Sequence, residues 1–305
     1  MSYHKERDRK ILEKLDNLVA TLPQPFCSRF FLGISQRTAP LTRLGYASDL
    51  RQFFDYFEKI ESPIKTKEDL DALGVHDIEL YVASLHQCGA ASKQRKLCTL
   101  RSFFAYLFKV ELISKNIMPN IDLPKVKEKP IIRMKNDEVE KMLDVVPSMR
   151  DEMILVLFLS TGIRVSELVG LDVSDVDLSN SSFKVTRKGG VETILYLPEE
   201  CAGQLAVYMS DLDEGPLFRT STGNRLGVRA IQLIVKRYAS AATPLKNISP
   251  HKLRSTFGTN LYRATGDIYI VADVLGHKDV NTTKKHYAAI NEDQRKEVAK
   301  HVKIY

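Results

Sequence analysis

The chain has 305 residues, 44% of them hydrophobic and 27% charged, and a formal net charge of +7. This length predicts two domains, and this composition is typical of a globular protein with hydrophobic cores. The positive charge permits an acidic partner such as nucleic acid, but it also fits many ordinary enzymes.

The sequence has none of the usual features of secreted or membrane-inserted proteins. Its longest apolar run, residues 153–159, is far shorter than the ~20 residues of a membrane-spanning helix, and residues 1–10 are too polar for a signal peptide. The four cysteines form no CxxC pair and have no histidine at ligand spacing, so neither a zinc site nor a disulfide framework is indicated. We expect a cytoplasmic protein.

The first part of the chain is predicted to be helical. Residues 1–41 are an N-terminal extension of uncertain role, with one helix around residues 8–21. Thr42 is then expected to cap a helix. Apolar side chains recur at helical spacing at Tyr46, Leu50, Phe53, Phe54 and Phe57, and again at Leu97, Leu100, Phe103, Phe104 and Leu107. This pattern predicts a helical domain over residues 42–124.

Residues 81–110 contain no Asp or Glu but several cations interleaved with aromatic rings. One interpretation is a solvated helix face. The other is a helix that contacts phosphates, because clustered Lys and Arg displace counterions from nucleic acid. The candidate DNA-binding residues are Lys93, Arg95, Lys96 and Arg101. Since no acid is near them in the sequence, we expect contacts to phosphates rather than to bases.

A linker is predicted over residues 125–132, in a segment with two prolines and alternating charges, because a proline disfavours helix in the residue before it. The second domain, residues 133–305, begins with a helix that Asn136 can cap. A second helix covers residues 150–161, and Gly162 ends it.

A β-hairpin interrupts this helical pattern. Residues 183–197 are β-branched and alternating around Gly189 and Gly190, a pair that favours a two-residue turn with Lys188 at its tip. Helical patterns then resume to the end of the chain. The predicted fold class is mainly α: a helical first domain and a mostly α second domain with a small β element.

Four short segments of the second domain carry candidate functional residues. Arg164 and Glu167 follow a helix break and share one helical face. His251 and Arg254 lie in the first turns of a helix that a Ser-Pro pair starts, where free backbone N–H groups favour an anion.

The last two segments follow a second helix break. His277 comes directly after the Leu-Gly end of a helix, and Tyr287 lies in the second turn of a helix capped by Asn281. Taken alone, each of the four segments has an ordinary explanation: a surface ion pair, a common His-x-x-Arg, a capping histidine or a core tyrosine. Their occurrence together and in this order favours a shared site.

In this order TGIRVSEL, the hairpin lysine, HKLR, LGH and the final tyrosine resemble the catalytic domain of the tyrosine recombinases, also called the phage integrase family. TRLGYASDLRQFFDY and KQRKLCTLRSFFAYLF resemble the two ends of that family's helical core-binding domain, so the resemblance covers roughly residues 42–290. It implies a catalytic set of Arg164, Lys188, His251, Arg254, His277 and Tyr287. Both a Xer-like recombinase and an integrase of a mobile genetic element fit, and the long segment before residue 42 favours the latter slightly.

These residue types suit cleavage of a phosphodiester by a tyrosine. Arg164 and Arg254 can neutralise the non-bridging oxygens in place of a metal, because each guanidinium is permanently charged and forked. Tyr287, with an ordinary pKa of ~10, needs a base or a cationic field, and His251 is the candidate base. His277 is an additional phosphate donor.

The departing 5′ oxygen needs a proton, which we assign to Lys188. Arg187 is the rival donor, but a guanidinium holds its proton too tightly to act readily as an acid. Glu167 is expected to orient its neighbours from behind the site.

We expect no cofactor. A covalent 3′-phosphotyrosine keeps the bond energy, so rejoining needs no ATP, and the sequence has no Walker motif. The best carboxylate cluster, Asp172, Asp175 and Asp177, lacks the glycine of an EF-hand loop and is predicted to form a turn after the Arg164 helix.

The expected activity is site-specific recombination of double-stranded DNA, in which strands are exchanged between two sites through a Holliday junction. The resemblance implies a homotetramer on two DNA sites and leaves room for an accessory or directionality protein. Two alternatives stay open: a type IB topoisomerase-like nicking-closing enzyme, and a non-catalytic DNA-binding accessory protein. Residues 288–305 carry spaced apolar side chains and are expected to dock on a neighbouring protomer or on their own domain.

Overall fold

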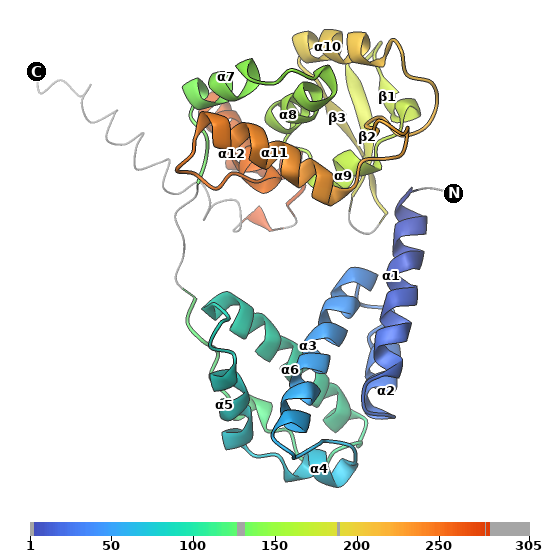
Figure 1. Cartoon of the computed structure of the whole chain (residues 1–305), viewed down its shortest axis with the longest axis vertical. Helices are drawn as coiled ribbons and strands as arrows, with labels where there is room; N and C mark the ends of the chain where they lie inside the picture. Colours follow the sequence, from blue (N-terminus) through green and yellow to red (C-terminus); the bar gives the residue numbers. More distant parts are fainter. Residues whose placement is uncertain (1–2, 127–131, 188–189, 278, 281–305) are drawn as a thin grey trace, which may run out of the picture. The chain divides into compact units, whose positions relative to one another are not determined.

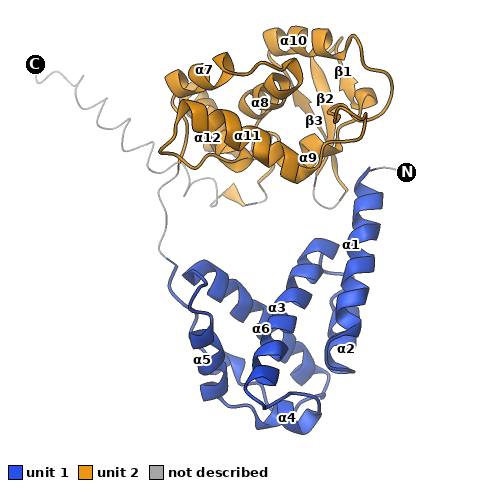
Figure 2. Cartoon of the chain, in the orientation of Figure 1, with its two compact units in different colours: residues 1–129 blue, residues 130–305 orange. Residues whose placement is uncertain are grey.

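The computed structural model describes residues 3–126, 132–187, 190–277 and 279–280, and the chain forms two compact units, residues 1–129 and 130–305 (Figures 1 and 2). The predicted mainly α fold class is confirmed, since helices dominate both units and the strands are confined to unit 2. Among the described residues, no helix combines the length and the apolar character needed to cross a membrane.

The described part of unit 1 is entirely helical. Its elements are α1 (Tyr3–Ala20), α2 (Phe26–Gly33), α3 (Pro40–Lys59), α4 (Lys67–Ala72), α5 (Val75–Ser84), α6 (Ala90–Lys109) and the short 3-10 helix η1 (Met118–Asn120). Aromatic rings fill its core. Phe30 meets Phe103 edge to face at 5.3 Å between ring centroids, and Phe53 meets Tyr81 at 5.2 Å. These contacts join α2, α3, α5 and α6, since aromatic pairs prefer this geometry.

The residues before position 42 belong to this core. α1 packs along α3, and α2 buries Phe26, Phe30 and Phe31. The predicted cap at Thr42 is wrong, because α3 begins at Pro40 after an extended Ala39. Proline suits the first helical turn, where its missing N–H would have no partner in any case.

Unit 2 combines helices with one small sheet. Its elements are α7 (Asn136–Asp144), α8 (Met149–Thr161), α9 (Val165–Gly170), the 3-10 helix η2 (Val173–Asp175), β1 (Val176–Asp177), β2 (Ser182–Thr186), β3 (Glu192–Tyr196), α10 (Glu199–Met209), α11 (Val228–Ala242), α12 (Pro250–Thr265) and α13 (Ile268–Leu275). The central helix is α8, which is buried on nearly all sides and packs against α10, α11 and α12. The second hydrophobic helix predicted after the linker is therefore the core of this unit.

The sheet is antiparallel in the order β1-β2-β3. Phe183 of β2 pairs with Val176 on one side and Leu195 on the other. The predicted hairpin is confirmed, but the predicted two-residue turn is wrong. The Arg187 backbone N–H donates to the Val191 carbonyl at 2.8 Å, which leaves residues 188–190 between the last paired positions.

Local capping chemistry fixes most helix ends in unit 2. Ser249 and Pro250 start α12 as predicted, and Gly276 ends α13 in the left-handed region. Asn136 is the first residue of α7 rather than its cap, so that prediction is wrong by one position. The start of α7 is held instead by Glu138, whose carboxylate accepts the Lys135 backbone N–H at 2.7 Å.

Candidate active site

Gly162 places Arg164 at a junction between helices. The glycine ends α8 with a φ of 62°, and a Cβ at this position would lie 2.4 Å from Cδ1 of Phe257 on α12. Both its backbone conformation and its close packing therefore require glycine. The chain then runs extended through Arg164 and enters α9.

Glu167 holds Arg164 at two points. One carboxylate oxygen accepts the Arg164 backbone N–H at 2.9 Å, and the other accepts from Nη1 of its guanidinium at 2.7 Å. Glu167 is only 3% exposed, so this pair is not the surface ion pair that the segment alone suggests. A buried carboxylate with two charge-assisted hydrogen bonds fixes the direction of the Arg164 side chain.

Arg254 is buried on α12, with 5% of its surface exposed. Its guanidinium donates to the carbonyl of Gly162 at the end of α8 and to the carbonyl of Leu275 at the end of α13. One planar fork thus joins three helices, with its two donors held in a fixed geometry that a compact ammonium group does not reproduce.

Three arginines converge on the C-terminal end of α13. Arg187 donates to the Val274 carbonyl at 2.8 Å, Arg254 donates to the Leu275 carbonyl, and Arg164 donates to the Gly276 carbonyl at 2.9 Å. We call these three residues the arginine cluster. The last carbonyls of a helix lack intrahelical partners and carry its negative dipole end, so they attract cations.

Arg187 is the member of this cluster that the sequence pointed to only as a rival of Lys188. Burial is the main cause that lowers the pKa of its guanidinium, while Glu167 raises that pKa and Arg164 lowers it. The influence of Glu167 and Arg164 on its charge places Arg187 among the candidate site residues. The signal in the sequence was its position beside Lys188 at the end of a predicted strand.

The two candidate histidines flank this cluster. His251 is exposed in the first turn of α12, three residues before Arg254 and so on the same side of the helix. His277 is half-buried and directly follows Gly276, and its backbone N–H donates to the Ala272 carbonyl at 2.9 Å. The left-handed glycine therefore turns the chain so that His277 leaves α13 beside the carbonyls that hold the arginines.

Lys188 and Tyr287 lie outside the described residues. The structure therefore brings together Arg164, Glu167, Arg254 and the segment of His277, which are far apart in the sequence, and adds Arg187.

The candidate DNA-binding cations of unit 1 have a carboxylate partner that the sequence did not predict. Asp49 of α3 is 2% exposed and accepts hydrogen bonds from Arg95, Lys96 and Thr99 of α6. Lys96 also donates to Gln52 of α3. We call these five residues the Asp49 network. The segment of residues 81–110 has no acid, as the sequence shows, but the fold supplies one from another helix.

The other two candidates of unit 1 differ from each other. Arg101 donates to the Ile121 carbonyl after η1, which ties the end of the unit to α6. Lys93 is half-buried near the start of α6. Arg95 keeps 54% of its side chain exposed although it pairs with Asp49.

The acidic segment after α9 forms the predicted turn at Asp172 and Asp175, as the 3-10 helix η2, whereas Asp177 lies in β1. Asp175 accepts the backbone N–H of Asp172 at 2.9 Å, Asp172 pairs with Arg225, and Asp177 accepts from Ser179 at 2.6 Å. These carboxylates are used in local capping and pairing. Within the described ranges, no group of three or more His, Cys, Asp or Glu side chains is arranged to hold a metal ion.

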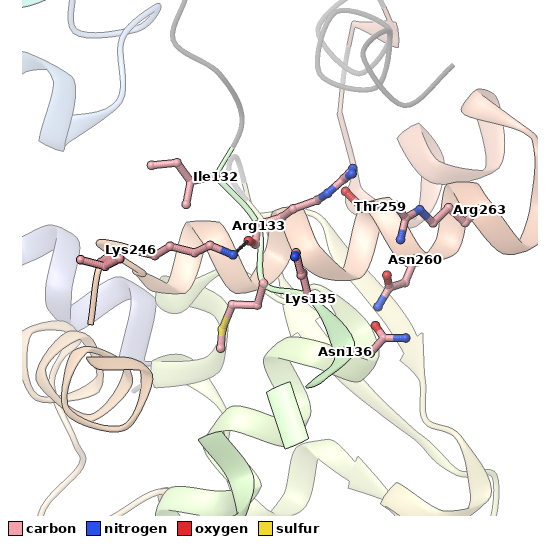
Figure 3. A pocket seen from close by; sticks show the side chains of 10 residues that line it. Ile132, Arg133, Lys135, Asn136, Lys246, Thr259, Asn260 and Arg263 are labelled. Atoms are coloured by element: carbon pink, nitrogen blue, oxygen red, sulfur yellow. Dashed lines mark hydrogen bonds between the residues drawn. The ribbon is translucent and has the colours of Figure 1, made fainter. Parts of the chain in front are cut away.

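A pocket of about 720 Å³ lies elsewhere on unit 2 (Figure 3). It is lined by the segment before α7, the loop after α11 and one side of α12, with Lys135, Lys246 and Arg263 among its cations. Arg263 is nine residues after Arg254, and at 100° per residue that is half a turn around the helix axis. The pocket is therefore on the opposite side of α12 from the arginine cluster and is not its substrate cleft.

Family models match both units. Residues 132–294 match the model described as the phage integrase family, and residues 28–110 match the model described as the phage integrase N-terminal SAM-like domain. The first match covers the arginine cluster, and the second covers the Asp49 network.

Curated proteins of similar sequence carry the name tyrosine recombinase XerC. The one from Pelobacter propionicus is 31% identical over 280 residues, which cover 88% of this chain and 91% of that protein. The one from Thermodesulfovibrio yellowstonii is 34% identical over 260 residues, covering 80% of this chain and 84% of that protein.

Solved structures share the fold. A XerH site-specific recombinase bound to a palindromic difH substrate has a TM-score of 0.70 at 20% identity, covering 95% of this chain and 94% of that one. A lambda integrase dimer bound to a core site has a TM-score of 0.70 at 17% identity, covering 86% and 93%.

Proposed function

The chain belongs to the phage integrase family and is a tyrosine site-specific recombinase, and from this premise we propose that it exchanges DNA strands between two duplex sites through a covalent protein–DNA intermediate. The convergence of Arg164 and Arg254 at the end of α13 is the observation that carries the proposal. Two forked cations held side by side match the two non-bridging oxygens of one phosphate.

The proposed reaction needs no external energy source. The Tyr287 oxygen forms a bond to phosphorus while the bond from phosphorus to the 5′ oxygen breaks, and the 5′ oxygen takes up a proton. The product is a 3′-phosphotyrosine and a free 5′ hydroxyl. When a 5′ hydroxyl from the other duplex attacks that phosphotyrosine, the reverse step releases the tyrosine and joins the strands, so ATP is not consumed.

The two arginines stabilise the negative charge of the phosphate and do not transfer protons. Negative charge grows on the non-bridging oxygens as the phosphorus is attacked, and preorganised donors stabilise it most strongly when they do not have to reorient. Glu167 fixes Arg164 and the backbone carbonyls fix Arg254 before DNA arrives. This support favours a role for both side chains at the phosphate.

Proton transfer falls to other side chains. We assign the base for Tyr287 to His251, the leaving-group acid to Lys188 and an additional phosphate hydrogen bond to His277. His251 is exposed beside Arg254, so it can reach a bound substrate. Lysine suits the acid role, because nearby cations lower its pKa into a useful range.

The DNA partner is a double-stranded recombination site that the two units bind together. We propose that four protomers assemble on two such sites, with residues 288–305 contacting a neighbouring protomer. Of the four candidate cations, Lys93 and Arg95 are the two that we propose to contact phosphates, since Arg95 is 54% exposed, whereas Lys96 is 9% exposed and held by the Asp49 network.

Covalent trapping tests the proposal. On a nicked DNA site, the wild-type protein should accumulate a covalent adduct, and Tyr287→Phe should form none while it binds the DNA as tightly, because only the phenolic oxygen is removed. An adduct that persists in Tyr287→Phe would reject Tyr287 as the nucleophile. Tyr305, Tyr269 and Tyr262 would then be the next residues to replace.

A junction assay separates this function from its alternatives. A recombinase should trap on DNA and also form Holliday junctions between two sites. A type IB topoisomerase-like enzyme would trap without junctions, and a non-catalytic accessory protein would do neither.

A sulfur-substituted substrate tests the acid. When sulfur replaces the bridging 5′ oxygen, the thiolate leaves without a proton. Lys188→Ala should then be largely rescued, whereas Arg164→Ala should stay slow, because its action on the non-bridging oxygens is unchanged. Failure of sulfur to rescue Lys188→Ala would remove Lys188 from this role.

A further inference from the structure

Arg187 connects the β2–β3 hairpin to the end of α13. Its backbone closes the hairpin, since its N–H donates to the Val191 carbonyl at 2.8 Å and its carbonyl accepts from the Gly190 N–H at 3.1 Å. Its side chain leaves the hairpin, and Nη2 donates to the Val274 carbonyl at 2.8 Å, 87 positions away in the sequence. One residue therefore joins the two segments that lead to Lys188 and to His277.

Gly276 makes room for this connection. A Cβ at position 276 would lie 2.0 Å from Nη1 of Arg187, closer than real Cβ atoms approach any atom. The glycine also has a φ of 61° at the end of α13. It therefore does two things, because it turns the chain toward His277 and leaves the space that the Arg187 guanidinium occupies.

A stabilising role alone does not explain why the Arg187 guanidinium lies at this partly buried position. Among the described residues, its Nε is buried without a hydrogen-bond partner. Burial is the largest influence on its pKa and lowers it, Arg164 lowers it further, and the nearby carboxylates of Glu167 and Asp273 raise it. Taking part of a cation out of water is costly when its hydrogen bond goes to a backbone carbonyl, as that of Arg187 does, rather than to a carboxylate. Residues kept under such conditions are found preferentially at functional sites.

We propose that Arg187 is a positioning residue that fixes the hairpin, and with it the adjacent Lys188, against the end of α13 where Arg164 and Arg254 are held. This inference rests on the proposed function, because it acts through the leaving-group acid. Arg187 would not contact the phosphate in this role. Its contribution is to keep the acid at the distance and angle that the 5′ oxygen requires.

The sulfur substrate separates positioning from direct charge stabilisation. On nicked DNA with the natural 5′ oxygen, Arg187→Ala should form the covalent adduct on the order of 10²-fold more slowly, the loss typical of a misplaced catalytic group. On the 5′-sulfur substrate its rate should return to within a few-fold of wild type. Arg187→Ala combined with Lys188→Ala should be no slower than Lys188→Ala alone. Arg187→Lys should recover part of the rate, since one donor can still reach the Val274 carbonyl.

Gly276→Ala tests the same contact between Arg187 and Val274 in a second way. A methyl group at position 276 should displace the Arg187 side chain, so adduct formation should be slow on the natural substrate and recover on the 5′-sulfur substrate. Gly266→Ala is the matched control, because Gly266 ends α12 at a φ of 67° with nothing within 4 Å of its would-be Cβ. It has the same backbone strain without the clash, so it should cleave both substrates at nearly the wild-type rate.

Each outcome decides between the hypotheses. If wild-type protein forms no adduct on either substrate, the proposed function itself fails. If wild type and sulfur-rescued Lys188→Ala behave as expected but Arg187→Ala stays slow on the sulfur substrate, Arg187 acts on the phosphate directly and the positioning role is rejected. An Arg187→Ala rate equal to wild type on the natural substrate would also reject it.

Discussion

Unit 1 and unit 2 both hold cations in fixed positions, but they do so with different acceptors. In the Asp49 network of unit 1, the acceptor is a buried carboxylate that binds an arginine and a lysine together. In the arginine cluster of unit 2, the main acceptors are three successive backbone carbonyls at the end of α13, and Glu167 binds only Arg164.

The acceptor decides what the cations can still do. A carboxylate cancels one full charge, so Asp49 offsets one of the two cations that it binds while it cross-links α3 to α6. A carbonyl is a dipole that orients a guanidinium without cancelling it. The arginine cluster therefore keeps most of its positive charge. Its guanidinium groups are already oriented before DNA binds, and such preorganised donors are what stabilises the charge on an attacked phosphate.

The largest expected effect is the loss of unit 1 stability when a substitution breaks the Asp49 network. Asp49→Ala leaves Lys96 buried without its carboxylate, and removal of one partner of a buried pair costs about 3–5 kcal/mol. Hydrogen exchange of unit 1 amides in the full chain measures this loss separately from unit 2. Asp55→Ala is the control, since it removes an exposed pair with Arg51 and should cost less than about 1 kcal/mol. Equal effects of the two substitutions would show that the network does not stabilise unit 1.

The next effect concerns the geometry of the arginine cluster. Arg254→Lys keeps the charge but loses the planar fork whose two nitrogens donate to the Gly162 and Leu275 carbonyls, so we expect adduct formation to fall at least about 10²-fold. Single-turnover trapping on nicked DNA measures it. Arg263→Lys makes the same change on the opposite side of α12 and should leave the rate nearly unchanged. A normal rate in Arg254→Lys would mean that charge alone suffices at this position.

Local chemistry made much of unit 2 predictable. Ser-Pro at the start of α12 and glycines after α8 and α13 act within one or two residues, so the sequence predicted these boundaries correctly. Candidate site residues could be identified because they occur in an ordered set of short motifs.

Long-range pairing was not predictable in the same way. Asp49 meets Arg95 across 46 positions, and Arg187 meets Val274 across 87. Neither pair has a local signature, because a side chain's charge is compensated by whichever helix the fold brings near it. The helix of residues 26–33 was also missed, although its buried residues Phe26, Phe30 and Phe31 recur at helical spacing, because only eight residues carry the pattern.

A smaller effect tests whether the stability of α13, whose last carbonyls hold the arginine cluster, depends on its N-terminal cap. The Asp267 carboxylate caps this helix by accepting the Tyr269 N–H at 2.7 Å, and its loss in Asp267→Ala should destabilise unit 2 by about 1 kcal/mol. Ser249→Ala is the matched control, because the Ser249 side chain makes no capping hydrogen bond at the start of α12. Hydrogen exchange in α13 should rise in the first variant only. The same change in both would show that the Asp267 cap does not hold the helix.

The smallest expected effect tests whether Asp49 still offsets the positive charge of Arg95 when the protein is bound to DNA. A cation that neutralises one phosphate contributes about one unit to the slope of log affinity against log salt. Lys93→Gln should therefore reduce the slope by about 1, equally on target and random duplexes, because phosphate contacts carry no sequence information. Arg95→Gln should reduce it by clearly less, since its guanidinium is bound to Asp49 although half its surface is exposed. Equal reductions would mean that Arg95 leaves Asp49 for a phosphate when DNA binds. The Asp49 network would then be a resting contact, and unit 1 would resemble unit 2 in holding a cation for its substrate.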